Sequence, residues 1–467
     1  MRVLLLVAVI SYAVPAVAQW SNDPLVNTAI STATGTQLTP MLTGDGAGGA
    51  IIVWEDNRGG GNPGIYAQRV SSTGQVQWAA NGVGISAPSP IQEEPAIVSD
   101  GSGGALIFWC DDHGTGSGRD IYAQRVNGSG VLQWAGAGVA VGVATNTQQT
   151  PVAVPDGSGG AVVVWKDFRS GGTAHLYAQR VSGAGALLWA GGTSGVAVHT
   201  ASDVLLWMGS TDGAGGMLLA WEDVRNGNFD AYAQRIKVDG TLGWAAGGVP
   251  AVSVAGDQRD PVVVTDGAGG AFVAWQDYAG SFAYYAQRLS GASGAQLWAS
   301  TNGLRISRVN SSCESLAADG TGRFYAALQD NSVDGDVYAN LVDSSGNLQW
   351  NSYTGSTISN AASYQYWPTV VADGTGAIFL WMDYRNGLQN VDIYGQRVNA
   401  SGTPLLTANG VALSTAASKQ EFPEMVLTAP GTVILTWADQ RVSSTDVQVY
   451  ATQFVAGVSG VQDWALF

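Results

Sequence analysis

Acidic and basic side chains recur along the chain at intervals of roughly fifty-five residues. An aspartate follows an apolar segment in every copy, at Asp56, Asp111, Asp167, Asp223, Asp277, Asp330, Asp383 and Asp439. Six copies have an arginine further along, at Arg69, Arg125, Arg180, Arg235, Arg288 and Arg397. A ring of carboxylates could bind metal ions, whereas carboxylates and guanidinium groups on adjacent strands would form ion pairs. Because eight identical sites rarely serve one chemistry, we predict no metal site and structural ion pairs that join Asp56 to Arg69, Asp167 to Arg180 and Asp223 to Arg235.

A second series of arginines stands two residues after the aspartate in five copies, at Arg58, Arg169, Arg225, Arg385 and Arg441. These side chains lie in an expected loop, where they could bind an acidic or hydroxylated ligand. The simpler interpretation is a solvated charge or a partner for the neighbouring aspartate.

Neutral amides form a third series, three residues before a proline, at Gln37, Gln92, Gln148, Gln258, Gln365 and Gln420. If this segment enters a strand beside a central channel, the amides would ring one mouth and suit sugar hydroxyls or peptide groups. The copies diverge near the same place, with Trp207, Tyr366 and Trp367, and exposed aromatic rings stack on sugars. The alternative is that each glutamine binds the backbone of a loop and that the aromatic side chains only pack.

Catalytic residues are harder to assign. The chain has three histidines, at positions 113, 175 and 199, and none has metal-ligand spacing or an obvious nucleophile partner. Two carboxylates would be enough for a glycosidase, but no copy carries a large insertion that would build a deep pocket. We therefore predict no catalytic residues and no cofactor.

All of these positions belong to one repeat, which predicts the fold. In the second copy, Asp100-Gly101-Ser102-Gly103-Gly104 is a tight turn that follows one short strand and precedes another, which ends at Trp109. Residues 121–126 are a third strand, and a turn at 127–130 leads to a fourth that carries Trp134. Eight such copies without a helical period predict an all-β, eight-bladed β-propeller of four-stranded antiparallel blades. An open β-solenoid is the rival architecture.

The expected blades span residues 37–86, 87–141, 142–198, 199–253, 254–307, 308–359, 360–414 and 415–467. The last copy ends at Phe467, soon after Trp464, which we assign as its fourth-strand tryptophan, and it lacks the tail seen at 81–86. The segment 20–31 offers a similar piece. We therefore predict that an N-terminal strand completes the last blade and closes the ring.

The N-terminus indicates export. Arg2, an apolar run over 3–10 and Ala16-Val17-Ala18 predict a signal peptide over 1–18, which leaves 19–467 as one secreted, extracellular, surface or periplasmic domain. The net charge of −16 argues against nucleic acid and anionic lipid as partners. No later segment is long enough to span a membrane. Cys110 and Cys313 fall on opposite sides of the ring, so we predict unpaired thiols.

The run from "YAQRV" through "SGxxxW" to "NGV" is similar to the delta-sixty type repeat, over most of the mature chain, and resembles the Gly- and Trp-rich propeller repeats of exported bacterial proteins. The resemblance implies an exported propeller and little about activity. We predict a non-catalytic recognition module that binds a glycan or a surface protein at the channel mouth. The alternatives are a self-associating structural subunit of an extracellular assembly and a glycan-cleaving hydrolase.

Overall fold

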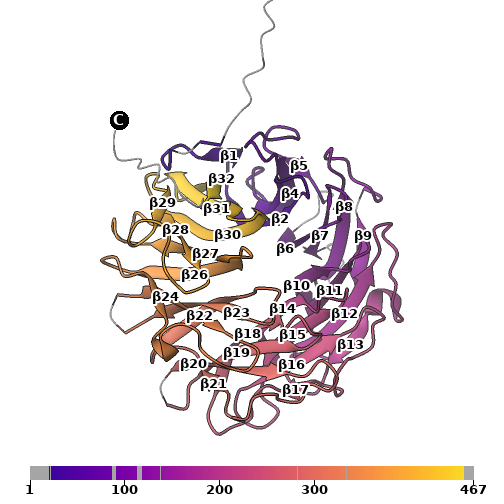
Figure 1. The fold of residues 1–467 in the computed structure, drawn as a ribbon. Coiled ribbons are helices and arrows are strands. Elements are labelled where there is room, and N and C mark those ends of the chain that lie inside the picture. The colour runs from indigo at the N-terminus through magenta and orange to yellow at the C-terminus, as the bar shows by residue number, and fades with distance from the viewer. Residues whose placement is uncertain are drawn as a thin grey trace, which may run out of the picture.

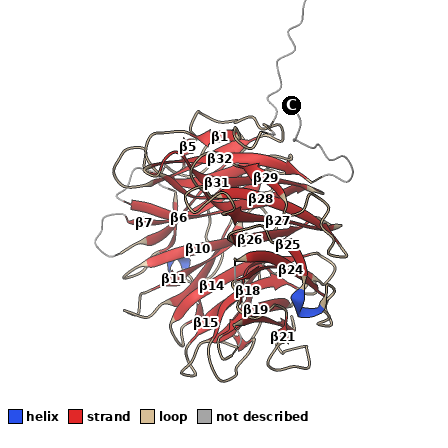
Figure 2. Cartoon of the chain, turned by 90° about the vertical axis from the view of Figure 1, so that its left-hand side faces the viewer, coloured by secondary structure: helices blue, strands red, loops and turns tan. Residues whose placement is uncertain are grey.

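The computed structural model describes residues 20–21, 23–86, 91–112, 118–136, 138–280, 282–332 and 334–456, with the side chains of residues 206 and 314 excepted. The predicted signal peptide and Trp464 lie outside these ranges. In the described part, eight four-stranded antiparallel sheets stand around a ring (Figure 1), and the two helices, η1 (Gly192–Ser194) and η2 (Ser352–Thr354), are single 3-10 turns (Figure 2). None of these helices is long and apolar enough to cross a membrane. The predicted eight-bladed β-propeller is confirmed.

We number the blades by their inner strands, which surround the axis. The inner strands of blades 1 to 8 are β2 (Gln37–Gly44), β6 (Ile91–Ser99), β10 (Gln148–Pro155), β14 (Val204–Thr211), β18 (Gln258–Thr265), β22 (Ser311–Ala318), β26 (Gln365–Ala372) and β30 (Gln420–Ala429). The second strands are β3 (Ala50–Asp56), β7 (Ala105–Asp112), β11 (Ala161–Asp167), β15 (Met217–Asp223), β19 (Ala271–Asp277), β23 (Phe324–Asp330), β27 (Gly376–Asp383) and β31 (Thr432–Ser443).

The third strands are β4 (Gly64–Val70), β8 (Asp120–Val126), β12 (His175–Val181), β16 (Asp230–Ile236), β20 (Ala283–Leu289), β24 (Asp336–Val342), β28 (Asp392–Asn399) and β32 (Asp446–Val455). The outer strands are β5 (Val83–Gly84), β9 (Val139–Gly142), β13 (Val196–His199), β17 (Val249–Pro250), β21 (Leu304–Arg305), β25 (Ser356–Ser359), β29 (Val411–Ser414) and, in blade 8, β1 (Thr28–Ser31). Each blade has four antiparallel strands, so the chain enters every blade from the same face of the ring. We call this face, where the inner strands begin, the upper face, and the face where they end the lower face.

The hydrophobic core lies between the blades. Second strands are almost wholly apolar because they are covered on both sides, and each core cluster joins neighbouring blades. For example, Ile51 and Val53 of blade 1 pack with Ala105 and Ile107 of blade 2. Cys110 and Cys313 are buried in two different clusters of this kind, and no disulfide joins them in the described part of the chain.

The lower face is held by one bonding pattern that recurs around the ring. The Arg69 guanidinium binds the Asp45 carboxylate in the turn between β2 and β3, and it donates to the Gly128 carbonyl of blade 2 at 2.9 Å. The indole nitrogen of Trp78 donates to the same carbonyl at 3.1 Å. In blades 1 to 5, one guanidinium and one indole therefore tie each blade to the turn of the next. Blade 6 keeps only the indole and blade 7 only the guanidinium.

The closure of the ring uses the same pattern. Strand β1 pairs with β32, so the N-terminal segment completes blade 8 as predicted. The Trp20 indole donates to the Ser72 carbonyl at 3.0 Å, and Gln453 donates to that carbonyl at 3.4 Å in the arginine position. Trp20 thus occupies the fourth-strand tryptophan position that the sequence assigned to Trp464.

The predicted pairing of aspartates with third-strand arginines is wrong. Asp56 binds the loop arginine Arg58 (2.6 Å), and Arg69 binds Asp45 instead. Asp167 and Asp223 likewise bind Arg169 and Arg225, whereas Arg180 binds Asp156 and Arg235 binds Asp212. The reason is strand register, because Asp56 lies opposite Gly64 at the upper end of the β3–β4 hairpin, and Arg69 lies opposite Ile51 near its lower end.

Candidate ligand-binding mouth of the channel

A β-bulge interrupts the upper end of the inner strand in all eight blades, and in six of them it stands directly before a proline. In blade 1, Leu38 pairs with Glu55 and Met41 with Val53, so two residues of β2 oppose one residue of β3. The residue before the proline adopts a left-handed backbone, with φ between 48° and 57°, at Thr39, Glu94, Thr150, Asp260, Trp367 and Phe422. We call these six the bulge residues. A bulge turns its side chain away from the regular direction of the strand, so these side chains are the ones that the fold displays at the upper mouth.

The bulge position varies although its surroundings repeat. A glutamine precedes it by two residues and a proline follows it in all six blades, yet its own residue is threonine, glutamate, aspartate, tryptophan or phenylalanine. Packing of the repeat therefore does not dictate this side chain. A constant scaffold with one variable displayed position is typical of a recognition surface.

The loop beside each bulge is fixed by a charged cluster in the blades that carry the second arginine series. In blade 1, the Trp54 indole donates to Asp56 at 2.7 Å, and Arg58 binds both oxygens of that carboxylate. The Arg58 guanidinium also lies 3.7 Å from the Tyr66 ring centroid. Blade 6 has Ser332 in the arginine position, and Arg308 supplies the guanidinium from another loop, where it binds Asp330 at 3.1 Å. The loop arginines are thus partners of the neighbouring aspartate.

The predicted ring of glutamines does not line the mouth. Gln37, Gln92, Gln148, Gln258, Gln365 and Gln420 are all buried. The Gln365 amide donates to the Ala361 and Ser363 carbonyls at 3.1 and 2.7 Å, and Gln37 and Gln420 fold back in the same way. Gln92 instead donates to Asp111 at 2.9 Å. The amides therefore hold the loops that enter the inner strands. This agrees with the alternative interpretation, in which each glutamine binds the backbone of a loop.

An aromatic shelf occupies the mouth at blades 7 and 8, and it consists of Tyr364, Tyr366, Trp367 and Phe422. Tyr364 and Tyr366 stack with centroids 5.2 Å apart, Trp367 lies 6.5 Å from Tyr366, and Phe422 lies 5.4 Å from Trp367. The exposed fractions of Trp367 and Phe422 are 45% and 54%. Trp207, in contrast, is buried in the core cluster of blades 3 and 4, so it is not part of this surface.

Bonds between blades hold the bulge backbone in place. The backbone N–H of Glu94 donates to Glu55 at 2.8 Å, that of Asp260 to Glu222 at 2.9 Å, and that of Trp367 to Gln329 at 3.3 Å. Burial raises the pKa of Glu55 and of Glu222 above the usual range. The mouth is therefore pre-formed, because the acceptor comes from the preceding blade each time.

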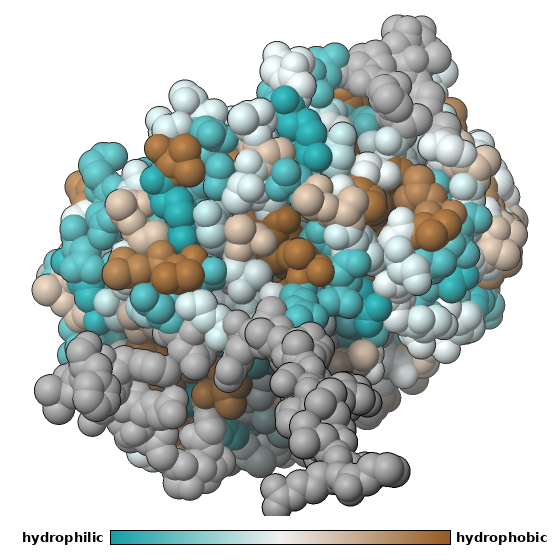
Figure 3. All heavy atoms as spheres, turned by 90° about the horizontal axis from the view of Figure 1, so that it is seen from above, coloured by the Kyte–Doolittle hydropathy of each residue, from teal (hydrophilic) through white to brown (hydrophobic). Residues whose placement is uncertain are grey.

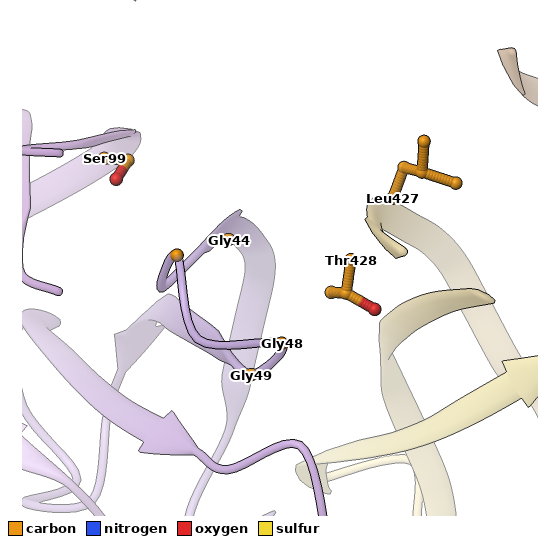
Figure 4. Close-up of a pocket in the computed structure, with 7 residues that line it drawn as sticks. Gly44, Gly48, Gly49, Ser99, Leu427 and Thr428 are labelled. Carbon is orange, nitrogen blue, oxygen red and sulfur yellow. The ribbon is translucent and has the colours of Figure 1, made fainter. Parts of the chain in front are cut away.

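Other surfaces offer less chemistry. A pocket of about 290 Å³ lies at the lower face, where the inner strands of blades 8, 1 and 2 end. Its lining includes Gly44, Gly48 and Gly49 together with Ser99, Leu427 and Thr428, and it has no charged side chain (Figure 4). On the side of the molecule in Figure 3, hydrophobic residues form separate groups among hydrophilic ones. Across the described ranges, no three His, Cys, Asp or Glu side chains are placed to hold a metal ion.

Comparison with known proteins finds similar structures but no related sequence family. No family model and no curated protein matches the chain. Among solved structures, it is similar to the BP39L lectin from Burkholderia pseudomallei at 12% identity, with 83% of this chain and 99% of that chain covered and a TM-score of 0.49. The polysaccharide lyase Uly1 matches at 8% identity over 82% and 93% of the two chains, with a TM-score of 0.47. A protein of unknown function from Dyadobacter fermentans matches at 8% identity over 92% and 98%, with a TM-score of 0.44.

Proposed function

We propose that this protein is a secreted recognition module that binds a neutral glycan on the aromatic shelf at the upper mouth. The observation that carries the proposal is the exposure of three rings, Tyr364, Trp367 and Phe422, which Tyr366 joins into one surface. The repeat itself requires no aromatic residue at these positions. Blades 1 and 3 have threonine at the bulge, so tryptophan and phenylalanine serve something other than blade packing.

The chemistry of the shelf suits a sugar ring. Aromatic faces contact the apolar C–H face of a pyranose, while the hydroxyl edges of the sugar remain free for water and for polar groups near the ring. The net charge of −16 disfavours an anionic polysaccharide through long-range repulsion. Neutral chains are therefore the expected ligands, and the signal-like N-terminus supports an encounter with them outside the cell.

The test replaces the bulge tryptophan with the residue that blade 1 uses. Trp367→Thr keeps a side chain that this left-handed bulge already accepts at Thr39, so the fold is retained. Binding is measured by affinity electrophoresis in gels that contain soluble neutral β-glucan, xyloglucan or galactomannan, followed by calorimetry with oligosaccharides of the retained polymer. We expect the affinity to fall about tenfold, because aromatic stacking contributes roughly 1.5 kcal/mol.

The matched control is Tyr353→Ala. Tyr353 is 45% exposed, as Trp367 is, but it lies in η2, away from the shelf, beside Arg305. Binding that is unchanged in Trp367→Thr, or lost equally in Tyr353→Ala, contradicts the proposal. Wild-type protein that no polymer of the panel retards contradicts it as well.

A further inference from the structure

A second group of side chains stands at the mouth between blades 4 and 5, apart from the aromatic shelf. It combines Glu222 at the end of β15, Asp260 at the bulge of β18, and Tyr278 and Phe282 in the loop between β19 and β20. An ion pair, Asp257 with Arg259, lies beside it. The chemistry here is acidic and aromatic together.

The cation already present, Arg259, is shared: it forms an ion pair with Asp257 and also attracts Glu222 and Asp260 at longer range. Arg259 binds Asp257 at 2.8 Å and lies 3.7 Å from the ring centroid of Phe229. Its distance from the Tyr278 centroid is 5.6 Å. The nearest lysine, Lys166, donates to the Leu205 carbonyl and interacts with Glu222 only through longer-range attraction. One guanidinium therefore serves the three carboxylates of Asp257, Glu222 and Asp260, so the Glu222–Asp260 pair stays incompletely neutralised.

The two carboxylates are close and poorly solvated. The Asp260 N–H donates to Glu222 at 2.9 Å, which brings the two acidic residues together. Among the described residues, the Asp260 carboxylate accepts one bond, from the Tyr278 hydroxyl at 3.4 Å. Burial raises the pKa of both groups, and for Glu222 the negative charge of Asp260 adds to that effect. Such a pair gains stability from an added cation.

Two exposed rings adjoin this pair: the Tyr278 hydroxyl reaches Asp260, and Phe282 packs against the Tyr278 ring. Tyr278 and Phe282 are perpendicular, at an interplanar angle of 75°, with centroids 5.1 Å apart. Their exposed fractions are 38% and 42%. Ring faces beside a carboxylate attract an ammonium group, because the quadrupole of the ring is negative over its face. A hard divalent ion would need a cage of oxygen ligands instead.

We propose that Asp260, Glu222, Tyr278 and Phe282 form a binding site for an organic ammonium group. Glu222 is buried and sets the negative potential, while Asp260 is partly accessible and contacts the ligand. An amino sugar and a lysine side chain both present this group. The site is separate from the aromatic shelf, so it stands whether or not the shelf binds a neutral glycan.

The experiment compares matched charged and neutral probes by calorimetry at neutral pH. One pair is a short β-1,4-linked glucosamine oligomer and its fully N-acetylated counterpart. The other pair is Nα-acetyl-lysine methylamide and the same compound acetylated on its ε-nitrogen. We expect at least one charged probe to bind about tenfold more tightly than its neutral counterpart, because acetylation removes the positive charge and with it the cation–π attraction. The pair that shows this preference identifies the source of the ammonium group.

The decisive variant is Asp260→Asn, which removes the charge and keeps the shape. Asparagine tolerates the left-handed backbone at this bulge (φ 52°), so the fold is retained. We expect it to reduce the affinity for the charged probe about tenfold, and Tyr278→Leu, which removes one ring face, to reduce it about threefold.

The control is Asp239→Asn, which makes the same change in net charge in an exposed turn of the lower face. It is expected to leave the affinity unchanged. No preference for either charged probe overturns the site, and so does an equal effect of Asp239→Asn and Asp260→Asn. Loss of neutral-glycan binding in Trp367→Thr with intact ammonium binding would separate the two proposals.

Discussion

The two faces of this propeller differ in how closely the residues of the repeat are kept from blade to blade. On the lower face, turn carbonyls at Gly128, Gly183, Val238, Gly291 and Ser344 each accept a bond from the arginine and the tryptophan of the preceding blade. On the upper face, the equivalent bulge position changes from threonine to carboxylates to large aromatics. Uniformity on one face stabilises the ring, and variation on the other supplies the different side chains on which the proposed recognition surface is built.

Blade 6 lacks the third-strand arginine of the lower pattern, and another arginine takes its place as partner of the turn aspartate. Its third strand has Leu341 in place of arginine, and Arg323 supplies a guanidinium to Asp319 at 2.6 Å from within the turn itself. The Trp350 indole still donates to the Ala400 carbonyl of blade 7 at 3.1 Å. The aspartate of the turn therefore retains a positive partner when the repeat drifts.

The largest effect is expected from opening the ring. Trp20→Ala removes the buried indole that joins blade 8 to the Ser72 carbonyl of blade 1 and leaves a cavity beside Gly74. We expect a loss of about 3–5 kcal/mol, the usual cost of truncating a buried tryptophan to alanine. The midpoint of denaturant unfolding reports it. A variant as stable as the wild type would show that the N-terminal segment does not close the ring.

A slightly smaller loss of stability is expected from breaking one ion pair of the lower face. Arg235→Leu leaves the nearly inaccessible Asp212 carboxylate without its guanidinium partner. Removing one partner of a buried pair costs about 3 kcal/mol. The control is Arg305→Leu, which removes the same charge from an arginine outside the lower pattern. Comparing the melting temperatures of the two variants distinguishes loss of the ion pair from loss of one positive charge. Equal melting temperatures would contradict the role given to the lower pattern.

Acid should weaken the loop clusters of the upper face. The pKa of Asp223 falls from 3.8 to about 2: burial alone would raise it, but bonds from Arg225, Trp221 and Ser202 outweigh that effect. A carboxyl whose folded pKa is lowered stabilises the fold above its unfolded pKa. This contribution, about 2 kcal/mol, disappears as the pH falls from about 4 towards 2. Unfolding free energies of wild type and Asp223→Asn should converge over that interval, and parallel curves would contradict the assignment.

A smaller effect is expected from a buried amide of the upper loops. Gln365→Ala removes donors to two loop carbonyls and leaves the rings of the aromatic shelf untouched. We expect a loss of about 1 kcal/mol, the net value of a typical hydrogen bond. Hydrogen exchange should show faster opening of residues 361–365 only. A global change in protection would mean that the loop belongs to the core.

The repeat period was enough to predict most of the fold, whereas the individual contacts depend on local geometry that the period does not show. Recurrent turns and tryptophans predict eight blades, and the missing tail of the last copy predicts closure by 20–31. The Asp–Arg pairs failed because similar charges recur in neighbouring strands, although the hairpin register places Asp56 and Arg69 at opposite ends. Trp464 was assigned by its spacing alone, which cannot distinguish it from Trp20.

The mouth was only partly predictable. Trp367 and Tyr366 were found because they break the repeat, but Phe422 in the next blade was missed. The signal that could have found it is the position before each proline, where the residue type varies between constant neighbours. Burial of the glutamines depends on how each loop folds back over its own amide, which side-chain chemistry alone does not reveal.

The most direct test of the difference between the faces is a paired measurement of stability and binding on one double variant, Trp367→Thr with Phe422→Thr. Its melting temperature and its affinity for the retained neutral polysaccharide are recorded on the same preparation. We expect an unchanged melting temperature and loss of binding. A lowered melting temperature with binding intact would contradict the proposed recognition surface, because the aromatic shelf would then stabilise the fold and not bind a ligand.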